Sequence, residues 1–145
     1  MENAPIPRAL TIAGAAARGG AGIQADIKTF QELDVFGISV ITAIVANHPQ
    51  TKRGVYPQTL EAIEAQLHTI LQDIGVDAVT TGMLFTKEVI TRMAEALADS
   101  DVAILVVDPV MIGTMGSSIL NDDAIEALTI DLFPIAKILT PNMPE

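Results

Sequence analysis

The sequence contains no cysteine and no tryptophan, and only 3% of its 145 residues are aromatic. Without thiols the chain can form neither a disulfide nor a thiolate metal site, which is typical of proteins in a reducing compartment. Basic residues are also scarce, because eight Lys and Arg stand against 18 Asp and Glu, giving a net charge of −10. This charge repels DNA, RNA and anionic lipid, so we expect neither nucleic acid nor membrane as a partner.

Long apolar runs are absent as well. No stretch reaches the roughly 18 consecutive apolar residues of a membrane helix. The first residues, MENAPIPRALTIAG, lack a basic segment ahead of a long apolar one, so we expect no signal peptide and a cytoplasmic location. What the sequence does contain is aliphatic: half of its residues are hydrophobic, and its length is sufficient for one domain with a real core.

Short apolar, β-branched segments alternate with segments whose apolar residues recur at helical spacing. The expected strands are 9–14, 36–46, 55–56, 77–81, 102–107 and 136–139, and the expected helices are 23–33, 59–74, 86–97 and 121–132. This alternation predicts an α/β fold with three layers: a mostly parallel sheet with helices on both faces and right-handed crossovers. No helix follows the last strand, so we expect 1–145 to be one part of a single domain whose sheet is incompletely covered.

Ligands of open α/β sheets bind outside the carboxyl ends of the strands. Gly19, Gly20 and Gly22 stand there at the start of a helix, where they would either face an anion with their N–H groups or only allow a tight turn. The segment GAGIQA matches the G-x-G-x-x-A pattern of dinucleotide-binding domains, which is weak evidence alone, and no acidic residue ends the second strand. No Gly-Lys-Ser/Thr follows, so the loop is not a P-loop.

Two aspartates are candidates for chemistry at the same edge. Asp108 ends a wholly apolar strand and is followed by proline, which favours a carboxylate directed toward a ligand. Asp26 lies one turn into the first helix, where it would bind a ligand hydroxyl or ring nitrogen, or simply stabilise the helix dipole. His48 and His68 are isolated, so we expect no metal site made by the chain itself.

Four ordered motifs together resemble one family. They are TIAG-x4-GGAGIQADIKTF from residue 11, TGM at 81–83, VVDPVM at 106–111 and TPN at 140–142. This set is similar to the hydroxymethylpyrimidine and phosphomethylpyrimidine kinases of the ribokinase-like superfamily and to the related bacterial pyridoxine/pyridoxal kinases. The longer loop VANHPQTKRGVYP resembles the pyridoxal-kinase branch, because the pyrimidine branch usually reads A-Q-N-T there.

The resemblance implies a fold, a reaction and a set of site residues. In the family, ATP with Mg²⁺ phosphorylates a hydroxymethyl group on a flat heteroaromatic ring. On the matching positions, Gly14, Asp26, Met83 and Val110 would line the ring pocket, Asn47 would stand where the pyrimidine enzymes place a glutamine, and Asp108 would face the phosphoryl side.

The chain also departs from the family pattern. Ala15, Ala16 and Ala17, followed by Arg18, replace the polar residues of the usual G-S-D-x-x-G-G corner, and Thr80 replaces the usual lysine. The C-terminal half, from which the family builds its nucleotide site and general base or reactive cysteine, is absent from these 145 residues. The resemblance therefore implies a substrate-binding half that is catalytically incomplete alone and does not itself bind ATP and Mg²⁺.

Several functions stay open at this point. The first is the substrate-binding half of a pyridoxine/pyridoxal kinase, and the second is the same half of a hydroxymethylpyrimidine (phosphate) kinase of thiamine synthesis. A third is a non-catalytic vitamer-binding or assembly module that completes its sheet with another copy, as a homo-oligomer, or with a separate chain. The weakest is a dinucleotide-binding domain.

Overall fold

The computed structural model describes residues 5–50, 54–113 and 118–145. The structure therefore leaves out residues 1–4, 51–53 and 114–117. A six-stranded sheet runs through the molecule in the order β3-β2-β1-β4-β5-β6, and all its neighbouring strands are parallel except the β2–β3 pair. The strands are β1 (Arg8–Ala16), β2 (Phe36–Val45), β3 (Val55–Pro57), β4 (Ala78–Thr81), β5 (Ile104–Val107) and β6 (Ile138–Leu139).

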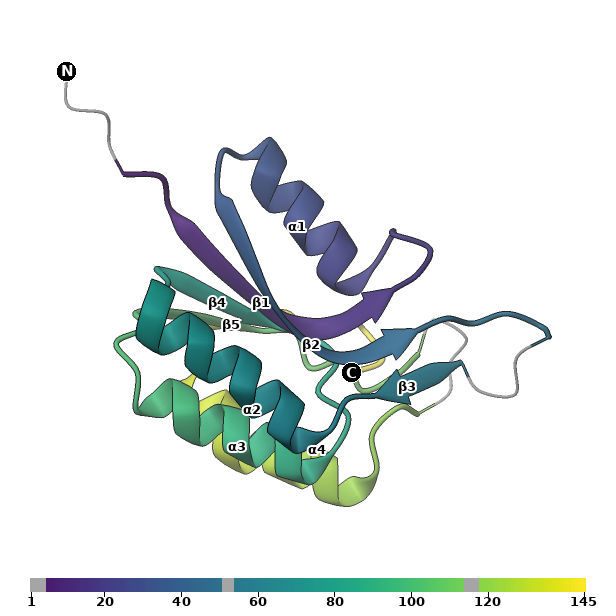
Figure 1. The fold of residues 1–145 in the computed structure, drawn as a ribbon. Coiled ribbons are helices and arrows are strands. Elements are labelled where there is room, and N and C mark those ends of the chain that lie inside the picture. The colour runs from purple at the N-terminus through teal and green to yellow at the C-terminus, as the bar shows by residue number, and fades with distance from the viewer. Residues whose placement is uncertain (1–4, 51–53, 114–117) are drawn as a thin grey trace.

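Helices cover both faces of this sheet. Helix α1 (Gly22–Glu32) lies on one face, over β1 and β2, while α2 (Leu60–His68), α3 (Lys87–Ala98) and α4 (Asp122–Ala127) lie on the other (Figure 1). Helix α2 continues as the π-helix η1 (Thr69–Ile74), and α4 continues as the π-helix η2 (Leu128–Leu132) and the 3₁₀ turn η3 (Phe133–Ile135). The three-layer architecture expected from the sequence is confirmed.

The main core lies between the sheet and the layer of three helices. Its largest fully buried side chains come from strands, helices and the η2 segment: Leu10, Ile12, Val40, Ile63, Leu67, Val79, Ile90, Met93, Val107, Leu128 and Leu132. A smaller cluster of Ala13, Ala15 and Ile23 joins β1 to α1 on the opposite face. The apolar residues that recur at helical spacing thus supply the helix side of this core.

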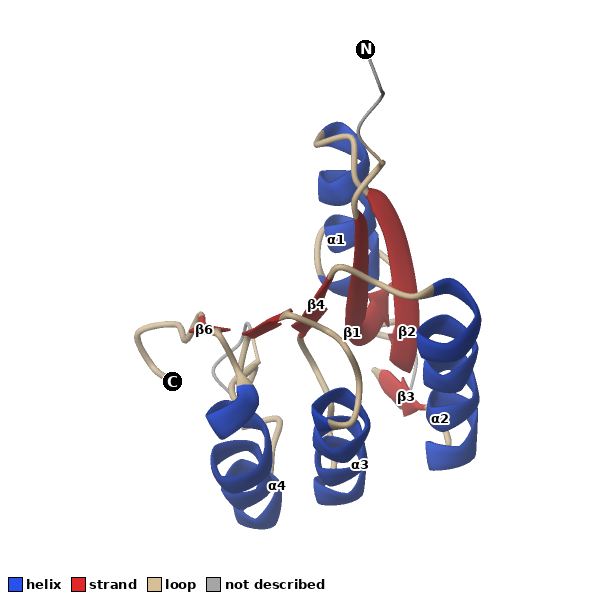
Figure 2. Ribbon diagram, turned by 90° about the vertical axis from the view of Figure 1, so that its left-hand side faces the viewer, coloured by secondary structure: helices blue, strands red, loops and turns tan. Residues whose placement is uncertain are grey.

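The face of the sheet beneath α1 is only partly covered. Register places Thr11, Thr80, Val106 and Ile138 in one row across β1, β4, β5 and β6 on that face. Helix α1 lies over β1 and β2 and does not extend over β5 and β6 (Figure 2). The apolar side chains of Ile104 and Ile138 accordingly remain 38% and 50% exposed among the described residues.

Helix starts agree with the capping residues expected from the sequence. The side chain of Thr86 accepts a hydrogen bond from Val89 N at 3.3 Å, and that of Asn121 accepts one from Ala124 N at 2.8 Å. Both contacts satisfy backbone donors that have no partner within the first turn. At the other end of α2 and η1, Gly75 stops the helical segment with a φ of +72°, as a terminating glycine should.

The first two strands differ from the expectation. β1 does not end at Gly14 but continues through Ala15 and Ala16, because a bulge at Thr42 lets β2 pair with it to its end. The second strand ends at Val45, one residue earlier than expected, and its apolar residues Phe36 and Ile44 are 57% and 46% exposed.

Other elements are shorter, or less buried at their ends, than their apolar pattern predicts. The last two strands begin at Ile104 and Ile138, later than the expected residues 102 and 136. Leu33 and Ile74, the apolar residues with which two of the expected helices end, are 67% and 41% exposed. Leu33 caps α1, and Ile74 lies in the π-helical turn that ends the segment, so neither follows the regular α-helical face.

Candidate ligand-binding site

Gly14 and Met83 form a wall at the carboxyl end of the sheet. A Cβ atom placed on Gly14 would lie 3.5 Å from Met83 Sδ and 3.4 Å from Val45 Cγ2, so the glycine backbone is in close contact with both side chains. These residues come from β1, β2 and the loop after β4. The structure thus brings together two of the residues assigned to the ring pocket and places Val45, which the sequence analysis did not identify, beside them.

The position of Met83 depends on the bulge in β2. The hydroxyl of Thr42, the residue left over by the bulge, donates to the Met83 carbonyl oxygen at 2.6 Å. Thr42 is 1% exposed, so this hydrogen bond is made in the interior. A bulge characteristically redirects one side chain, and here it fixes the loop that carries Met83.

Asp26 is held by the strand beneath it. Thr11, which is fully buried in β1, donates its hydroxyl to Asp26 Oδ2 at 2.6 Å. Helix α1 has no acidic residue in its first turn, so Asp26 is beyond the positions where a carboxylate pairs with the helix dipole. Of the two readings left open by the sequence, the structure therefore disfavours a helix-dipole role.

The glycine-rich corner between β1 and α1 is a tight turn. Gly22 has a φ of +59°, and a Cβ atom there would lie 2.1 Å from the Gly14 carbonyl oxygen. The N–H groups of Ala16 and Ala17 are already bonded to Gln24 Oε1 at 2.7 Å and to the Val45 carbonyl oxygen at 2.9 Å. Gly19 N, one of the expected anion donors, also donates to the Ala16 carbonyl oxygen at 2.8 Å, so these contacts favour the packing role of the corner.

Asp108 follows β5 at the same edge and is half-buried. Burial raises the pKa of its carboxyl above the ordinary value, and the negative charges of Glu145 and Asp26 raise it further, against the opposing effect of a hydrogen bond from Val110 N at 3.4 Å. Val110 itself has a φ of +24°, which is strained for a β-branched residue. Because the negative charge of Asp26 contributes to the raised pKa of Asp108, the two carboxylates interact electrostatically.

Glu145 is a further carboxylate of this edge, and the sequence analysis missed it. Its Oε1 accepts hydrogen bonds from Met111 N at 2.9 Å and Ile112 N at 3.4 Å, while Oε2 accepts one from Asn142 N at 3.0 Å. It thereby joins the loop after β5 to the segment after β6. The signal available in the sequence was its position three residues after Asn142, within a loop that follows a strand.

Asn47 is exposed beyond the end of β2. A Cβ atom on Gly54 would lie 1.7 Å from its Oδ1, so its side chain lies against that glycine. Its backbone oxygen accepts a long hydrogen bond, 3.5 Å, from Arg18 Nη2. No hydrogen bond within the described residues joins the Asn47 amide to Asp26 or Asp108, and its assignment to the site stays a prediction.

The carboxylates do not form a metal site of their own. Within residues 5–50, 54–113 and 118–145, no group of three or more His, Asp or Glu side chains is arranged to hold a metal ion. The oxygens of Glu145 already accept backbone hydrogen bonds.

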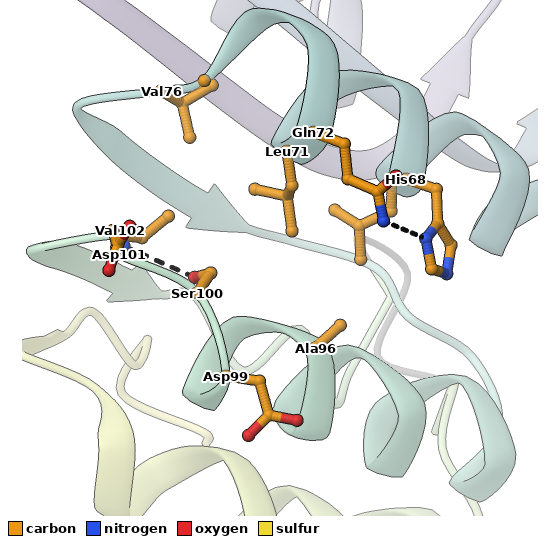
Figure 3. A pocket seen from close by; sticks show the side chains of 11 residues that line it. His68, Leu71, Gln72, Val76, Ala96, Asp99, Ser100, Asp101 and Val102 are labelled. Atoms are coloured by element: carbon orange, nitrogen blue, oxygen red, sulfur yellow. Dashed lines mark hydrogen bonds between the residues drawn. The ribbon is translucent and has the colours of Figure 1, made fainter.

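A pocket of about 480 Å³ lies at the opposite edge of the sheet, between the ends of η1 and α3 (Figure 3). Its lining combines apolar residues with polar ones: Leu67, His68, Leu71, Gln72, Gly75, Val76, Ala96, Asp99, Ser100, Asp101 and Val102. His68 is bonded to Gln72 there at 3.1 Å. We place the candidate site at the carboxyl edge instead, because that is where ligands of open α/β sheets bind and where Asp26 and Asp108 converge.

No helix in the described parts of the chain has the length and apolar character needed to span a bilayer.

Known proteins resemble this chain over nearly its whole length. It is 46% identical to the hydroxymethylpyrimidine/phosphomethylpyrimidine kinase of Bacillus subtilis, over 97% of this chain and 52% of that protein. It is 44% identical to the pyridoxine kinase of the same organism, over 95% of this chain and 52% of that protein. The chain thus spans about half the length of the curated relatives it matches.

Solved structures of kinases also resemble this chain. The pyridoxal kinase from Staphylococcus aureus in complex with AMP-PCP and pyridoxal superposes with a TM-score of 0.85 at 43% identity, covering 96% of this chain and 49% of that one. This neighbour carries a ribokinase-like vitamin-kinase fold. The model of the phosphomethylpyrimidine kinase family matches residues 17–145, which include Asp26, Met83, Asp108 and Val110. This chain therefore belongs to the phosphomethylpyrimidine kinase family.

Proposed function

We propose that this chain is the substrate-binding half of an ATP-dependent kinase that phosphorylates the hydroxymethyl group of pyridoxine or pyridoxal. The observation that carries the proposal is the Asp26 carboxylate, which Thr11 holds and whose charge acts on Asp108, together with the Gly14–Met83 wall at the carboxyl end of the strands. A flat ring would pack on the wall, and Asp26 would accept a hydrogen bond from a ring substituent. Asp108 would face the group to be phosphorylated.

Asp108 suits that position electrostatically. Its raised pKa reflects burial and two neighbouring negative charges, so it gains from a ligand that brings a hydrogen-bond donor or positive charge. In the family, the nucleotide and Mg²⁺ supply the phosphoryl group and neutralise its charge. No step proposed here uses a metal bound by this chain, and we expect the chain alone to bind substrate without phosphorylating it.

Hydroxymethylpyrimidine is the alternative substrate. The chain is 46% identical to a relative from the pyrimidine branch and 44% identical to one from the pyridoxine branch. This difference is too small to assign the chain to either branch. The stretch VANHPQTKRGVYP, residues 45–57, is longer than in the pyrimidine branch and favours a vitamin B6 substrate. Both ligands are flat heteroaromatic rings with a hydroxymethyl group, so the same site would accept either chemistry.

Calorimetric titration of the chain with pyridoxal, pyridoxine and hydroxymethylpyrimidine tests the proposal. We expect at least one ring to bind, and Asp26→Asn to weaken it roughly tenfold, as loss of a hydrogen bond to a charged group should. Asp73→Asn, at an exposed position of η1, is the matched control for a change of one charge. Failure of all three rings to bind, or equal affinity in Asp26→Asn, would contradict the proposal.

A non-catalytic assembly module is the second candidate, and the uncovered sheet face favours it. Ile104 and Ile138 are exposed on the face that α1 leaves bare, and β6 is an edge strand among the described residues. Such an edge and face pair readily with another chain. Light scattering after size exclusion should then show an oligomer that Ile138→Lys converts to a monomer. A monomeric unmodified chain would count against assembly.

A further inference from the structure

The hydroxyl of Thr11 has a single described partner, the Asp26 carboxylate. Thr11 is fully buried in the middle of β1, and its Oγ1 lies 2.6 Å from Asp26 Oδ2. That distance is typical of a hydroxyl donating to an ionised carboxylate. A buried donor with no partner is costly, so the hydrogen bond fixes the direction of both side chains.

The same contact leaves the second oxygen of Asp26 available. Oδ1 accepts no hydrogen bond from any residue that the structure describes, whereas Oδ2 is taken by Thr11. Helix α1 is tied to β1 a second time, through Gln24 Oε1 and Ala16 N at 2.7 Å. The backbone that carries Asp26 is therefore tied to β1, and the hydrogen bond from Thr11 leaves Oδ1 as the carboxylate oxygen without a described donor.

We propose that Thr11 positions the Asp26 carboxylate so that Oδ1 accepts one hydrogen bond from an N–H or O–H group on a heteroaromatic ligand. This inference rests on the proposed function, since it names what prepares that site for its ligand. Thr11 does not touch the ligand and is a positioning residue. Its effect on binding passes entirely through Asp26.

Thr80 provides a matched control. It occupies the same row as Thr11 on the neighbouring strand β4 and on the same face of the sheet. It has the same side chain and makes no hydrogen bond to Asp26. Replacement of either threonine by valine removes one hydroxyl at nearly constant volume, so a difference between the two variants reports on the contact with Asp26.

The test is a thermodynamic cycle on ligand affinity, measured by calorimetry with pyridoxal and hydroxymethylpyrimidine. Thr11→Val should weaken binding about tenfold, the loss expected when an acceptor is no longer held in place. Thr11→Ser keeps the hydroxyl and should restore affinity to within about threefold, and Thr80→Val should leave it unchanged. The double variant Thr11→Val/Asp26→Ala should bind no more weakly than Asp26→Ala alone, because Thr11 acts only through Asp26. Unchanged affinity in Thr11→Val, or independent losses in the double variant, would overturn the inference.

A second cycle, on thermal stability, needs no ligand. Thr11→Val and Asp26→Ala should each lower the melting temperature, and together they should lower it by less than the sum. Fully additive losses would overturn the positioning of Asp26 by Thr11. Absence of binding by the unmodified chain would instead contradict the proposed function, so the two failures are distinguishable.

Discussion

The hydroxyl of Thr42 and the carbonyl oxygen of Met83 are 2.6 Å apart, although 41 residues separate them in the sequence. This contact reaches from the bulge in β2 to the loop after β4, on the other side of β1. It couples the shape of one strand to the position of a residue in the candidate site. Both the stability of the fold and the geometry of the ring-binding wall therefore depend on this hydrogen bond.

Thr42→Val should destabilise the chain by about 1–3 kcal/mol, because it leaves the Met83 carbonyl without its buried donor. Urea unfolding followed by circular dichroism measures this loss. Thr42→Ser retains the hydroxyl and should recover most of the free energy of unfolding. Equal stability of Thr42→Val and the unmodified chain would show that the contact contributes nothing.

Gly22→Ala should disrupt the corner between β1 and α1. The new methyl group would lie 2.1 Å from the Gly14 carbonyl oxygen, at a backbone φ of +59° that L-residues avoid. We expect the free energy of unfolding to fall by about 1–3 kcal/mol, the usual cost of such backbone strain. Gly20→Ala is the matched control, since nothing lies within 4 Å of its Cβ position. Similar melting temperatures for the two variants would argue against the tight-turn role.

Asp108→Asn should stabilise the chain in a pH-dependent manner. The pKa of Asp108 is raised above its ordinary 3.8, so the folded chain holds this proton more tightly than the unfolded chain. Ionisation therefore costs stability above the raised pKa, and the cost disappears as the pH falls below about 3.8. The variant should melt higher than the unmodified chain at pH 7, and this gain should fade as the pH falls.

Melting curves between pH 3 and pH 8 measure this gain, with Asp101→Asn as the control for loss of one exposed charge. Asparagine can still accept the hydrogen bond from Val110 N, so that contact is retained. A variant less stable than the unmodified chain at pH 7, or one with a gain independent of pH, would refute the environment described for Asp108.

Glu145→Ala should loosen the loop after β5. Its carboxylate accepts hydrogen bonds from Met111 N and Asn142 N, and these amides lose their partner in the variant. Hydrogen exchange followed by NMR should become roughly tenfold faster at both amides, the change expected for a charge-assisted hydrogen bond. Glu145→Gln keeps an oxygen acceptor and should show a smaller increase. Unchanged exchange at Met111 would contradict the contact.

Much of the fold follows from local patterns. The alternation of β-branched and amphipathic segments predicted the parallel sheet, and capping by Thr86 and Asn121 placed the starts of two helices. These features depend on residues close together in sequence. The extension of β1 to Ala16 could not be predicted in this way, because it depends on a bulge at Thr42 in another strand.

The candidate site was predictable only in part, for the same reason. Gly14 and Met83 were assigned through the family resemblance, and the structure places them side by side, while their role in a ring pocket stays a prediction. The hydrogen bond from Thr11 to Asp26 required the register of α1 on β1, which no periodicity specifies. Glu145 was missed because its role depends on the packing of its loop against Met111.

The central claim is that a heteroaromatic ring binds at the carboxyl edge of the sheet rather than in the pocket at the opposite edge. Titration of ¹⁵N-labelled chain with pyridoxal or hydroxymethylpyrimidine, followed through backbone amide shifts, tests it most directly. The account predicts the largest shifts at Gly14, Asp26, Met83 and Val110. Shifts centred on Val76 and Val102, which line the opposite pocket, would contradict it.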